Sequence, residues 1–257
     1  MRRTVSELKA LIFDVDGTLS DTERDGHRVA FNRAFTEAKL DWCWDVETYG
    51  LLLKVTGGKE RIRYFLKDFQ PGFEAPVHLD GFIRKLHQSK TRHYVELLQS
   101  GAIPLRPGVE RLLNEARSAG LRLAIATTTT PENVTTLLSS TLGAESIDWF
   151  DVIAAGDVVP NKKPAADIYQ YALNEMELSA AECVVFEDSE NGLLSSMQAG
   201  LKTIVTVNGY TLDDNFDGAL IVLDQLGEPG SPFTLIKGRA GGATFVDVPM
   251  IRHLFKA

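Results

Sequence analysis

The chain has 257 residues, of which 44% are hydrophobic, so it can bury one large core or two smaller ones. Its net charge of −8 argues against nucleic acid and anionic membranes as partners, but not against a small anionic ligand. No apolar run approaches the roughly 18 residues of a membrane span, and the start lacks a secretory segment. We therefore expect a cytoplasmic protein, or a chloroplast stroma protein without its transit peptide.

The first predicted element is a buried parallel strand at Ala10–Phe13, where four consecutive residues are apolar or small. Two carboxylates, Asp14 and Asp16, follow it directly, and Gly17 then turns the chain. Ligands of open α/β sheets bind at the carboxyl ends of the strands. Because residues i and i+2 of a strand share a face, both acids can reach one reacting group. One acid can attack while the other moves protons, and a divalent metal can lie between them.

The segment from residue 21 to residue 100 contains helical patterns and almost no strand pattern. Helices are predicted over His27–Ala38, around the repeat from Ile62 to Phe69, and from Phe82 to Leu98. We interpret the segment as a helical insert after the first strand. Its linkers, near residues 20–23 and 101–107, are placed to act as hinges.

A candidate anion site lies within this insert. Gly57 and Gly58 precede a helix that begins near Lys59, and such a start exposes backbone N–H groups that attract anions. Lys59 and Arg63 are i, i+4 neighbours and share one helix face, with the apolar stripe on the opposite face. An ordinary solvated helix face is the alternative.

The remainder of the chain alternates strands and helices, which predicts right-handed crossovers and a mostly parallel, Rossmann-like α/β sheet with helices on both faces. Thr130 is a predicted N-cap with Pro131 at the first helical position, and Ser189 is another predicted N-cap. We expect strands at Leu121–Ala126, Asp151–Ala155, Cys183–Phe186, Leu201–Val205 and Ala219–Leu223, and helices at Pro131–Ser140, Ala165–Met176, Glu190–Ala199 and Val248–Phe255.

Three further groups of polar residues follow strands of this sheet. Thr127 and Thr128, at a strand end that leads into a helix, predict an anion site. Lys163 can neutralise a phosphate as a compact point charge. Glu187 and Asp188 directly follow the Cys183–Phe186 strand, where acids are good ligands for a hard metal ion.

Together these residues suit Mg²⁺-dependent phosphoryl transfer through an aspartyl phosphate. Asp14 attacks phosphorus, while the metal neutralises charge on Asp14 and the phosphoryl oxygens. Lys163 and Thr127 hold the transferring oxygens. Asp16 protonates the leaving oxygen and then activates water.

The motifs D-V-D-G-T, the strand that ends in Thr127, K-P at Lys163 and E-D-S at Glu187 resemble the four motifs of the haloacid dehalogenase superfamily. The insert resembles the C1 cap of its β-phosphoglucomutase subgroup. The resemblance implies a cap domain at residues 21–101 and a catalytic core at residues 1–20 and 102–257. It also implies that Asp14, the carbonyl of Asp16 and Asp188 bind the metal, with Glu187 close by.

A finer resemblance is to the phosphatase family that accompanies Rubisco, carried by D-T-E-R-D-G-H-R, T-G-G-K-E-R, P-L-R-P-G-V and G-D-V-V-P-N-K-K-P. That family hydrolyses the Rubisco inhibitor xylulose 1,5-bisphosphate to xylulose 5-phosphate. The resemblance implies a small sugar bisphosphate as ligand, Mg²⁺ as cofactor and a monomeric enzyme. The implied substrate contacts are Glu23, Tyr49, Gly57, Gly58, Lys59 and Arg63 in the cap and Thr128 in the core.

Two other functions remain open at this point. The first is a phosphosugar mutase with the same fold and nucleophile. Mutases of the subgroup place a histidine just beyond the hinge, and His27 lies one residue away from the expected register. The second is a non-catalytic phosphate-sensing module, since receiver domains also combine acids, a threonine and a lysine on a parallel sheet.

Overall fold

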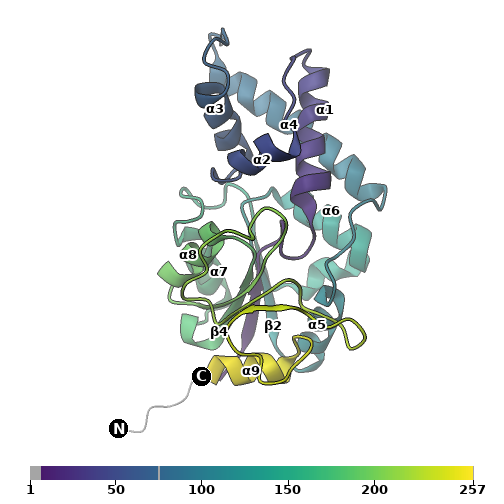
Figure 1. Ribbon diagram of the computed structural model, residues 1–257, viewed down its shortest axis with the longest axis vertical. Coiled ribbons are helices and arrows are strands. Elements are labelled where there is room, and N and C mark those ends of the chain that lie inside the picture. The colour runs from purple at the N-terminus through teal and green to yellow at the C-terminus, as the bar shows by residue number, and fades with distance from the viewer. Residues whose placement is uncertain (1–6, 75, 257) are drawn as a thin grey trace.

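The computed structural model describes residues 7–74 and 76–256, so the outermost residues of the predicted core ranges, 1–6 and 257, lie outside it. Its seven-stranded sheet has the order β3-β2-β1-β4-β5-β6-β7, parallel from β3 to β6 and antiparallel at β7. This confirms the predicted α/β fold class (Figure 1). The strands are β1 (Ala10–Phe13), β2 (Arg122–Ala126), β3 (Val152–Ala154), β4 (Cys183–Glu187), β5 (Lys202–Thr206), β6 (Ile221–Leu223) and β7 (Leu235–Lys237).

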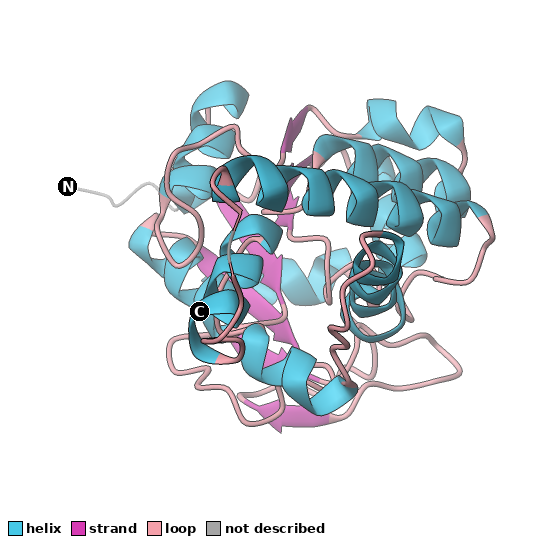
Figure 2. Cartoon of the chain, turned by 90° about the horizontal axis from the view of Figure 1, so that it is seen from above, coloured by secondary structure: helices cyan, strands magenta, loops and turns pink. Residues whose placement is uncertain are grey.

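Helices cover both faces of the sheet (Figure 2). In β1, Leu11 and Phe13 pack on the side of α5, α6 and α9, whereas Ala10 and Ile12 pack on the side of α7. Both faces of β1 are therefore buried, which explains its unbroken apolar sequence. The helices of this part are α5 (Val109–Ser118), α6 (Pro131–Leu142), α7 (Asp167–Met176), α8 (Glu190–Gln198) and α9 (Val248–Lys256).

The inserted segment forms the helices above the sheet in Figure 1. A buried aromatic cluster that includes Phe31, Phe35, Trp42, Trp44 and Phe65 gives it a core of its own. Because this cluster is separate from the sheet's clusters, we propose that the segment is a cap domain with the predicted bounds of 21–101. Its helices are α1 (Arg28–Glu37), preceded by one π-helical turn (Glu23–His27), α2 (Val46–Leu52), α3 (Gly58–Asp68) and α4 (Leu79–Gln99).

The C-terminal end of α4 joins the core of the sheet part. Tyr94 and Leu98 of α4 belong to the same buried cluster as Leu137 and Leu138 of α6. The helical insert is consequently anchored on α6 as well as held by its two linkers.

The C-terminal segment completes the sheet part by adding one strand and one helix. Strand β7 pairs antiparallel with β6, and its three residues are exposed. Helix α9, predicted almost to the residue, buries Ile251 and Leu254 against the main core at the end far from α1–α4 (Figure 1). In the described residues, no helix is both long and apolar enough to cross a bilayer.

Candidate active site

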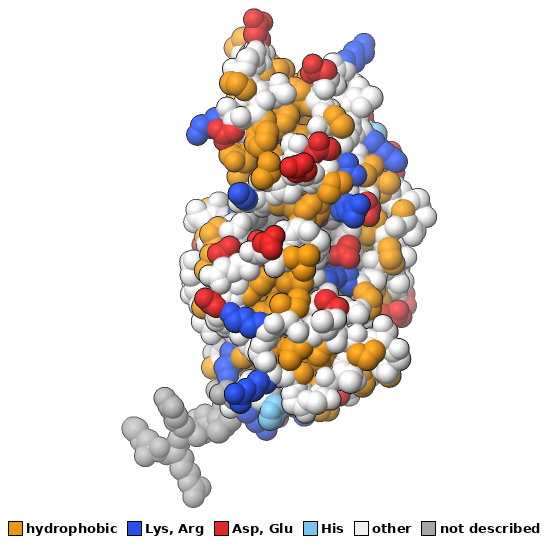
Figure 3. Space-filling view, in the orientation of Figure 1, with side chains coloured by type: hydrophobic (Ala, Val, Ile, Leu, Met, Phe, Trp, Pro, Cys, Tyr) orange, Lys and Arg blue, Asp and Glu red, His pale blue; other side chains and the backbone are white. Residues whose placement is uncertain are grey.

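A cavity of about 420 Å³ lies where the helical insert meets the carboxyl ends of the strands, and the surface is hollowed between the two parts (Figure 3). Its lining includes Asp14, Asp16, Glu187 and Asp188, so the structure brings the four predicted acids together. The turn after them requires glycine. Gly17 has a φ of +87°, and a Cβ there would lie 2.1 Å from Asp188 Oδ2.

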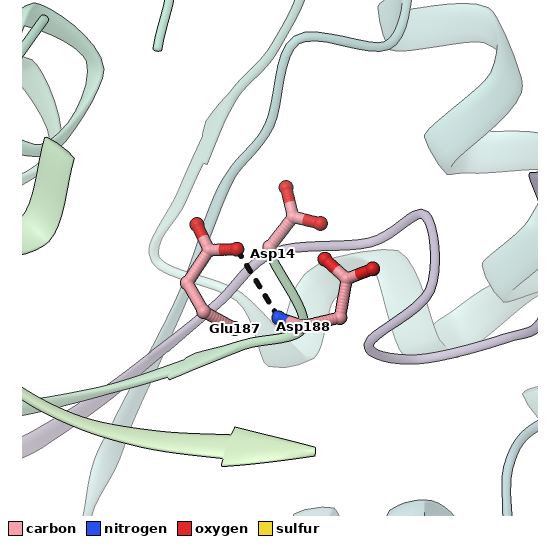
Figure 4. A group of neighbouring side chains, drawn as sticks. All are labelled: Asp14, Glu187 and Asp188. Carbon is pink, nitrogen blue, oxygen red and sulfur yellow. Dashed lines mark hydrogen bonds between the residues drawn. The ribbon is translucent and has the colours of Figure 1, made fainter. Parts of the chain in front are cut away.

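The three acids Asp14, Glu187 and Asp188 face one another at the ends of β1 and β4 (Figure 4). The parallel register pairs the last residue of β1, Phe13, with Phe186, so Asp14 lies beside Glu187. One carboxylate oxygen from each acid lies within 4.8 Å of the others. The Nζ of Lys163 donates to Asp14 Oδ1 at 2.7 Å and to Glu187 Oε1 at 2.6 Å. Lys163, and not its neighbour Lys162, is therefore the lysine at the site.

The electrostatics of this cluster suit a metal ion. Burial raises the pKa of Asp14 to about 8; Glu187 and Asp16 add to this rise and Lys163 opposes it. Burial and the charges of Asp14 and Glu187 also raise the pKa of Asp188 well above its usual value. Since buried anions repel one another until a cation joins them, three carboxylates with one lysine fit a divalent ion.

We expect Mg²⁺ to raise the melting temperature more near pH 8.5 than near pH 6. The folded pKa of Asp14 is raised to about 8, so this carboxyl destabilises the metal-free fold progressively as the pH rises toward that value. Metal binding displaces the proton and relieves the repulsion. Melting curves with Mg²⁺ and with KCl of matched ionic strength would measure the difference. A Mg²⁺ effect that is independent of pH would contradict the role of Asp14 as a ligand.

Asp16 lies in a separate hydrogen-bond network at the start of the insert. Its Oδ1 is 2.6 Å from Thr22 Oγ1 and 2.7 Å from His27 Nε2, and His27 Nδ1 is 2.7 Å from Lys90 Nζ. Burial alone would raise the pKa of Asp16, but the charge and hydrogen bond of His27 hold it below its usual range. Asp16 is thus ionised here. His27 contacts the candidate acid–base despite its shifted register.

The predicted threonine site lies at the end of β2. Thr127 is buried, its N–H donates to Ala154 O at 2.9 Å, and its Oγ1 accepts from Thr129 N at 3.3 Å. Thr127 and Thr128 both line the cavity. Thr130 caps α6 as predicted, by accepting from Asn133 N.

On the insert side, Glu23 and Arg61 line the same cavity. Tyr49 is fully buried behind them, donates to Glu23, and accepts from Arg61 Nη1 at 2.6 Å. The guanidinium of Arg61 also lies 3.6 Å from Glu23 and over the Tyr49 ring. The insert thus brings two basic side chains to the cavity, Lys54 and Arg61; Lys54 is exposed and Arg61 is buried.

The other predicted residues of the insert are placed differently. Arg63 is half-exposed and pairs with Asp80 at 2.9 Å, so the structure does not bring it to the cavity. Lys59 pairs with Asp157 across the seam between the insert and the sheet part. Gly57, Gly58 and Lys59 line a neighbouring cavity that shares Thr128 with the first. The predicted common face of Lys59 and Arg63 is therefore not directed at one ligand.

Sequence reasoning did not single out three residues that lie near the site. Asn208 donates to Asp188 Oδ2 at 2.7 Å, and Tyr169 donates to Glu187. Arg61, on the buried face of α3 with Ile62, is the third. Two signals could have identified Arg61: it ends the T-G-G-K-E-R motif, and it lies beside the apolar stripe of α3, where a basic residue on a buried face needs an anionic partner.

A family model described as haloacid dehalogenase-like hydrolase matches residues 8–200. The fold and the acid cluster thus define an enzyme, a haloacid dehalogenase-like phosphatase. This finding overturns the non-catalytic alternative.

Similar proteins and solved structures identify the family within this class of hydrolases. The chain is 47% identical to the plasmid protein CbbY of Cupriavidus necator, over 88% of each chain. It is 43% identical to a CBBY-like protein of Arabidopsis thaliana, over 86% of this chain and 70% of that one. The crystal structure of CbbY from Rhodobacter sphaeroides with phosphate matches with a TM-score of 0.80 and 47% identity, over 85% of this chain and 94% of that one. The chain belongs to the CbbY proteins of the haloacid dehalogenase-like hydrolases.

Proposed function

We propose that the protein is a Mg²⁺-dependent sugar-bisphosphate phosphatase that hydrolyses xylulose 1,5-bisphosphate to xylulose 5-phosphate and phosphate, and so removes a Rubisco inhibitor. The observation that carries this proposal is the buried cluster of Asp14, Lys163, Glu187 and Asp188 beneath a cavity whose far wall contains Arg61. A point mutant of Rhodobacter sphaeroides CbbY, with a TM-score of 0.80 and 46% identity to this chain, was crystallised with xylulose-(1,5)bisphosphate.

In the proposed reaction, a carboxylate oxygen of Asp14 attacks phosphorus and the bond to the sugar oxygen breaks. Asp16 gives a proton to that leaving oxygen. In the second step, Asp16 takes a proton from water, the water oxygen attacks the aspartyl phosphate, and Asp14 is regenerated with release of phosphate. Because Asp16 is ionised in the free protein, the arriving phosphate must first raise its proton affinity. Lys163 and Thr127 hold the transferring oxygens.

The metal would be held by Asp14, Asp188 and the carbonyl of Asp16, with Glu187 beside it and engaged by Lys163 and Tyr169. When bound, it would supply positive charge that offsets the negative charge of the transferring phosphoryl group. Asn208 holds the orientation of Asp188 through its amide.

The second phosphate of the substrate is assigned to the cap. Arg61 supplies a buried cation at the cavity wall, and its Tyr49 and Glu23 contacts hold its side chain in place. The N-terminus of α3 has no side-chain cap, so the N–H groups after Gly57 remain available to an anion. Arg61 replaces Arg63 in the proposed substrate-binding set, while Glu23, Tyr49, Gly57, Gly58, Lys59 and Thr128 remain in it.

A panel of sugar mono- and bisphosphates with Mg²⁺ tests the proposal. We expect phosphate release in proportion to substrate consumed, with the highest kcat/KM for xylulose 1,5-bisphosphate against ribulose 1,5-bisphosphate and the monophosphates. Isomerised sugar phosphate without phosphate release would instead support the mutase. The contact of His27 with Asp16 is the observation that favours the mutase as a second candidate, because mutases of the subgroup place a histidine just beyond the hinge.

Arg61→Ala and Arg63→Ala form a matched pair that tests the cap assignment. We expect Arg61→Ala to lower kcat/KM for the bisphosphate about 100-fold or more, because a buried charged contact to phosphate is lost, and to change turnover of a small aryl phosphate far less. Arg63→Ala should leave both substrates almost unchanged. Equal losses on both substrates in Arg61→Ala would show that Arg61 only stabilises the fold.

We also propose that the enzyme works as a monomer, in the cytoplasm or, as a processed plastid protein, in the chloroplast stroma. A relative at 43% identity comes from a plant, Arabidopsis thaliana. Size-exclusion chromatography with light scattering would measure the oligomeric state, and a dimer at low micromolar concentration would contradict this part of the proposal.

A further inference from the structure

Arg106 is a buried arginine that none of the chemistry above uses. It lies in the second linker, just before α5, and only 8% of it is exposed to solvent. A guanidinium at this depth needs a partner for each of its donors. Its partners come from several chain segments that meet at the active edge of the sheet.

The guanidinium of Arg106 binds backbone carbonyls from three separate loops. Nη1 donates to the carbonyl of Gly17 and, at 3.0 Å, to that of Thr206. Nη2 donates to the carbonyls of Val207 and Asp224, each at 2.6 Å. These carbonyls lie at or after the ends of β1, β5 and β6, so one side chain joins the carboxyl ends of three strands of the sheet.

The same residue also joins the two linkers of the cap. The Arg106 N–H donates to Leu19 O at 2.8 Å, and Ser20 Oγ donates to Pro104 O at 2.8 Å. The Nε of Arg106 lies 3.5 Å from Asp21 Oδ1. The two linkers are therefore paired with each other, and the pair is attached to the sheet edge through Arg106.

Two of the three loops carry residues that hold the metal site. Gly17 directly follows Asp16 in the turn that packs against Asp188. Val207 directly precedes Asn208, whose amide donates to Asp188 Oδ2 at 2.7 Å.

This inference rests on the proposed function. We infer that Arg106 is a positioning residue: through the Gly17 and Asn208 loops it fixes the position of the Asp188 carboxylate, and it links that carboxylate to the two linkers of the cap. Lysine does not replace it, because an ammonium is a single point with three donors, whereas the planar guanidinium reaches several carbonyls in fixed directions. If Arg106 only stabilised the fold, its substitution would lower the melting temperature and leave the Mg²⁺ affinity unchanged.

The test is Mg²⁺ binding by isothermal titration calorimetry to the full-length wild type, Arg106→Lys and the control Arg111→Lys. Arg111 lies on α5 and binds Glu228 and the Gly227 carbonyl, away from the acids. We expect Arg106→Lys to weaken Mg²⁺ binding about 10-fold, the lower range for residues that orient metal ligands. Arg111→Lys should bind Mg²⁺ as the wild type does.

A double-mutant cycle with Asn208→Ala identifies the route. Since both changes act on the same carboxylate, the double variant should lose less Mg²⁺ affinity than the product of the two single losses. Wild-type affinity in Arg106→Lys, with only a lower melting temperature, would overturn the inference. Should Arg106→Lys fail to fold, wild-type affinity in Asn208→Ala would overturn it equally. Absence of Mg²⁺ binding to the wild type would instead refute the metal dependence of the proposed function, and the inference with it.

Discussion

Asp14→Asn is expected to abolish phosphate release and, in the absence of divalent metal, to raise the melting temperature. An amide does not form the aspartyl phosphate, so kcat should fall roughly 10⁴-fold or more, the scale of losing a nucleophile. Stability should rise because the substitution removes the buried Asp14 carboxyl, whose pKa is raised to about 8, mainly by burial and further by the charge of Glu187. By linkage, the gain grows as the pH rises from about 4 to about 8.

The control for this variant is Asp151→Asn, a carboxylate at the amino end of β3 that pairs with Arg122. Asp151 lies at the amino ends of the strands, whereas the acid cluster lies at their carboxyl ends, so this variant should retain wild-type turnover. Phosphate release and melting temperature are measured for both variants with and without Mg²⁺. Turnover by Asp14→Asn above about one hundredth of the wild-type rate would exclude Asp14 as the nucleophile.

Lys163→Met is expected to have the largest effect on stability. The ammonium contacts Asp14 and Glu187 at 2.7 and 2.6 Å, so its removal leaves buried carboxylates without their cation. Removing one partner of such a buried pair costs about 3–5 kcal/mol. Mg²⁺ should restore part of the lost stability. Turnover should stay at least about 100-fold lower, because the positive charge of Lys163 that holds the transferring oxygens is missing.

Lys162→Met is the matched control, one residue away. Lys162 binds Asp157 and the Gly156 carbonyl, outside the acid cluster. Urea unfolding of both variants measures the difference in the free energy of unfolding. A larger loss in Lys162→Met than in Lys163→Met would contradict the assignment of Lys163 to the site.

The parts of the fold that local chemistry dictates could be predicted from the sequence. Strand β1 has the predicted bounds because each of its residues is buried on one face or the other. The caps Thr130 and Ser189 follow from side-chain oxygens that satisfy the first N–H groups of their helices. The four motifs meet at one edge because parallel strands end on the same side.

Features that depend on tertiary packing could not be predicted in this way. Strand β7 has three exposed residues, so no alternation of polar and apolar side chains marks it. The spacing of Lys59 and Arg63 was a valid helical pattern, but the packing of α3 against the aromatic cluster turned Arg61 inward instead. Asn208 and Arg106 act through partners far along the chain, and only the folded loops reveal them.

The insertion of the cap between β1 and β2, two adjacent strands, has a thermodynamic consequence. Both linkers leave the sheet at its active edge, and the cap therefore meets the core at a high effective concentration. For the proposed substrate, a bisphosphate is then a bivalent ligand, with one phosphate on the core and the other on a tethered second site. Weak contacts at the two phosphate sites then combine into a high affinity for the bisphosphate. A monophosphate occupies one of the two sites and therefore binds with much lower affinity.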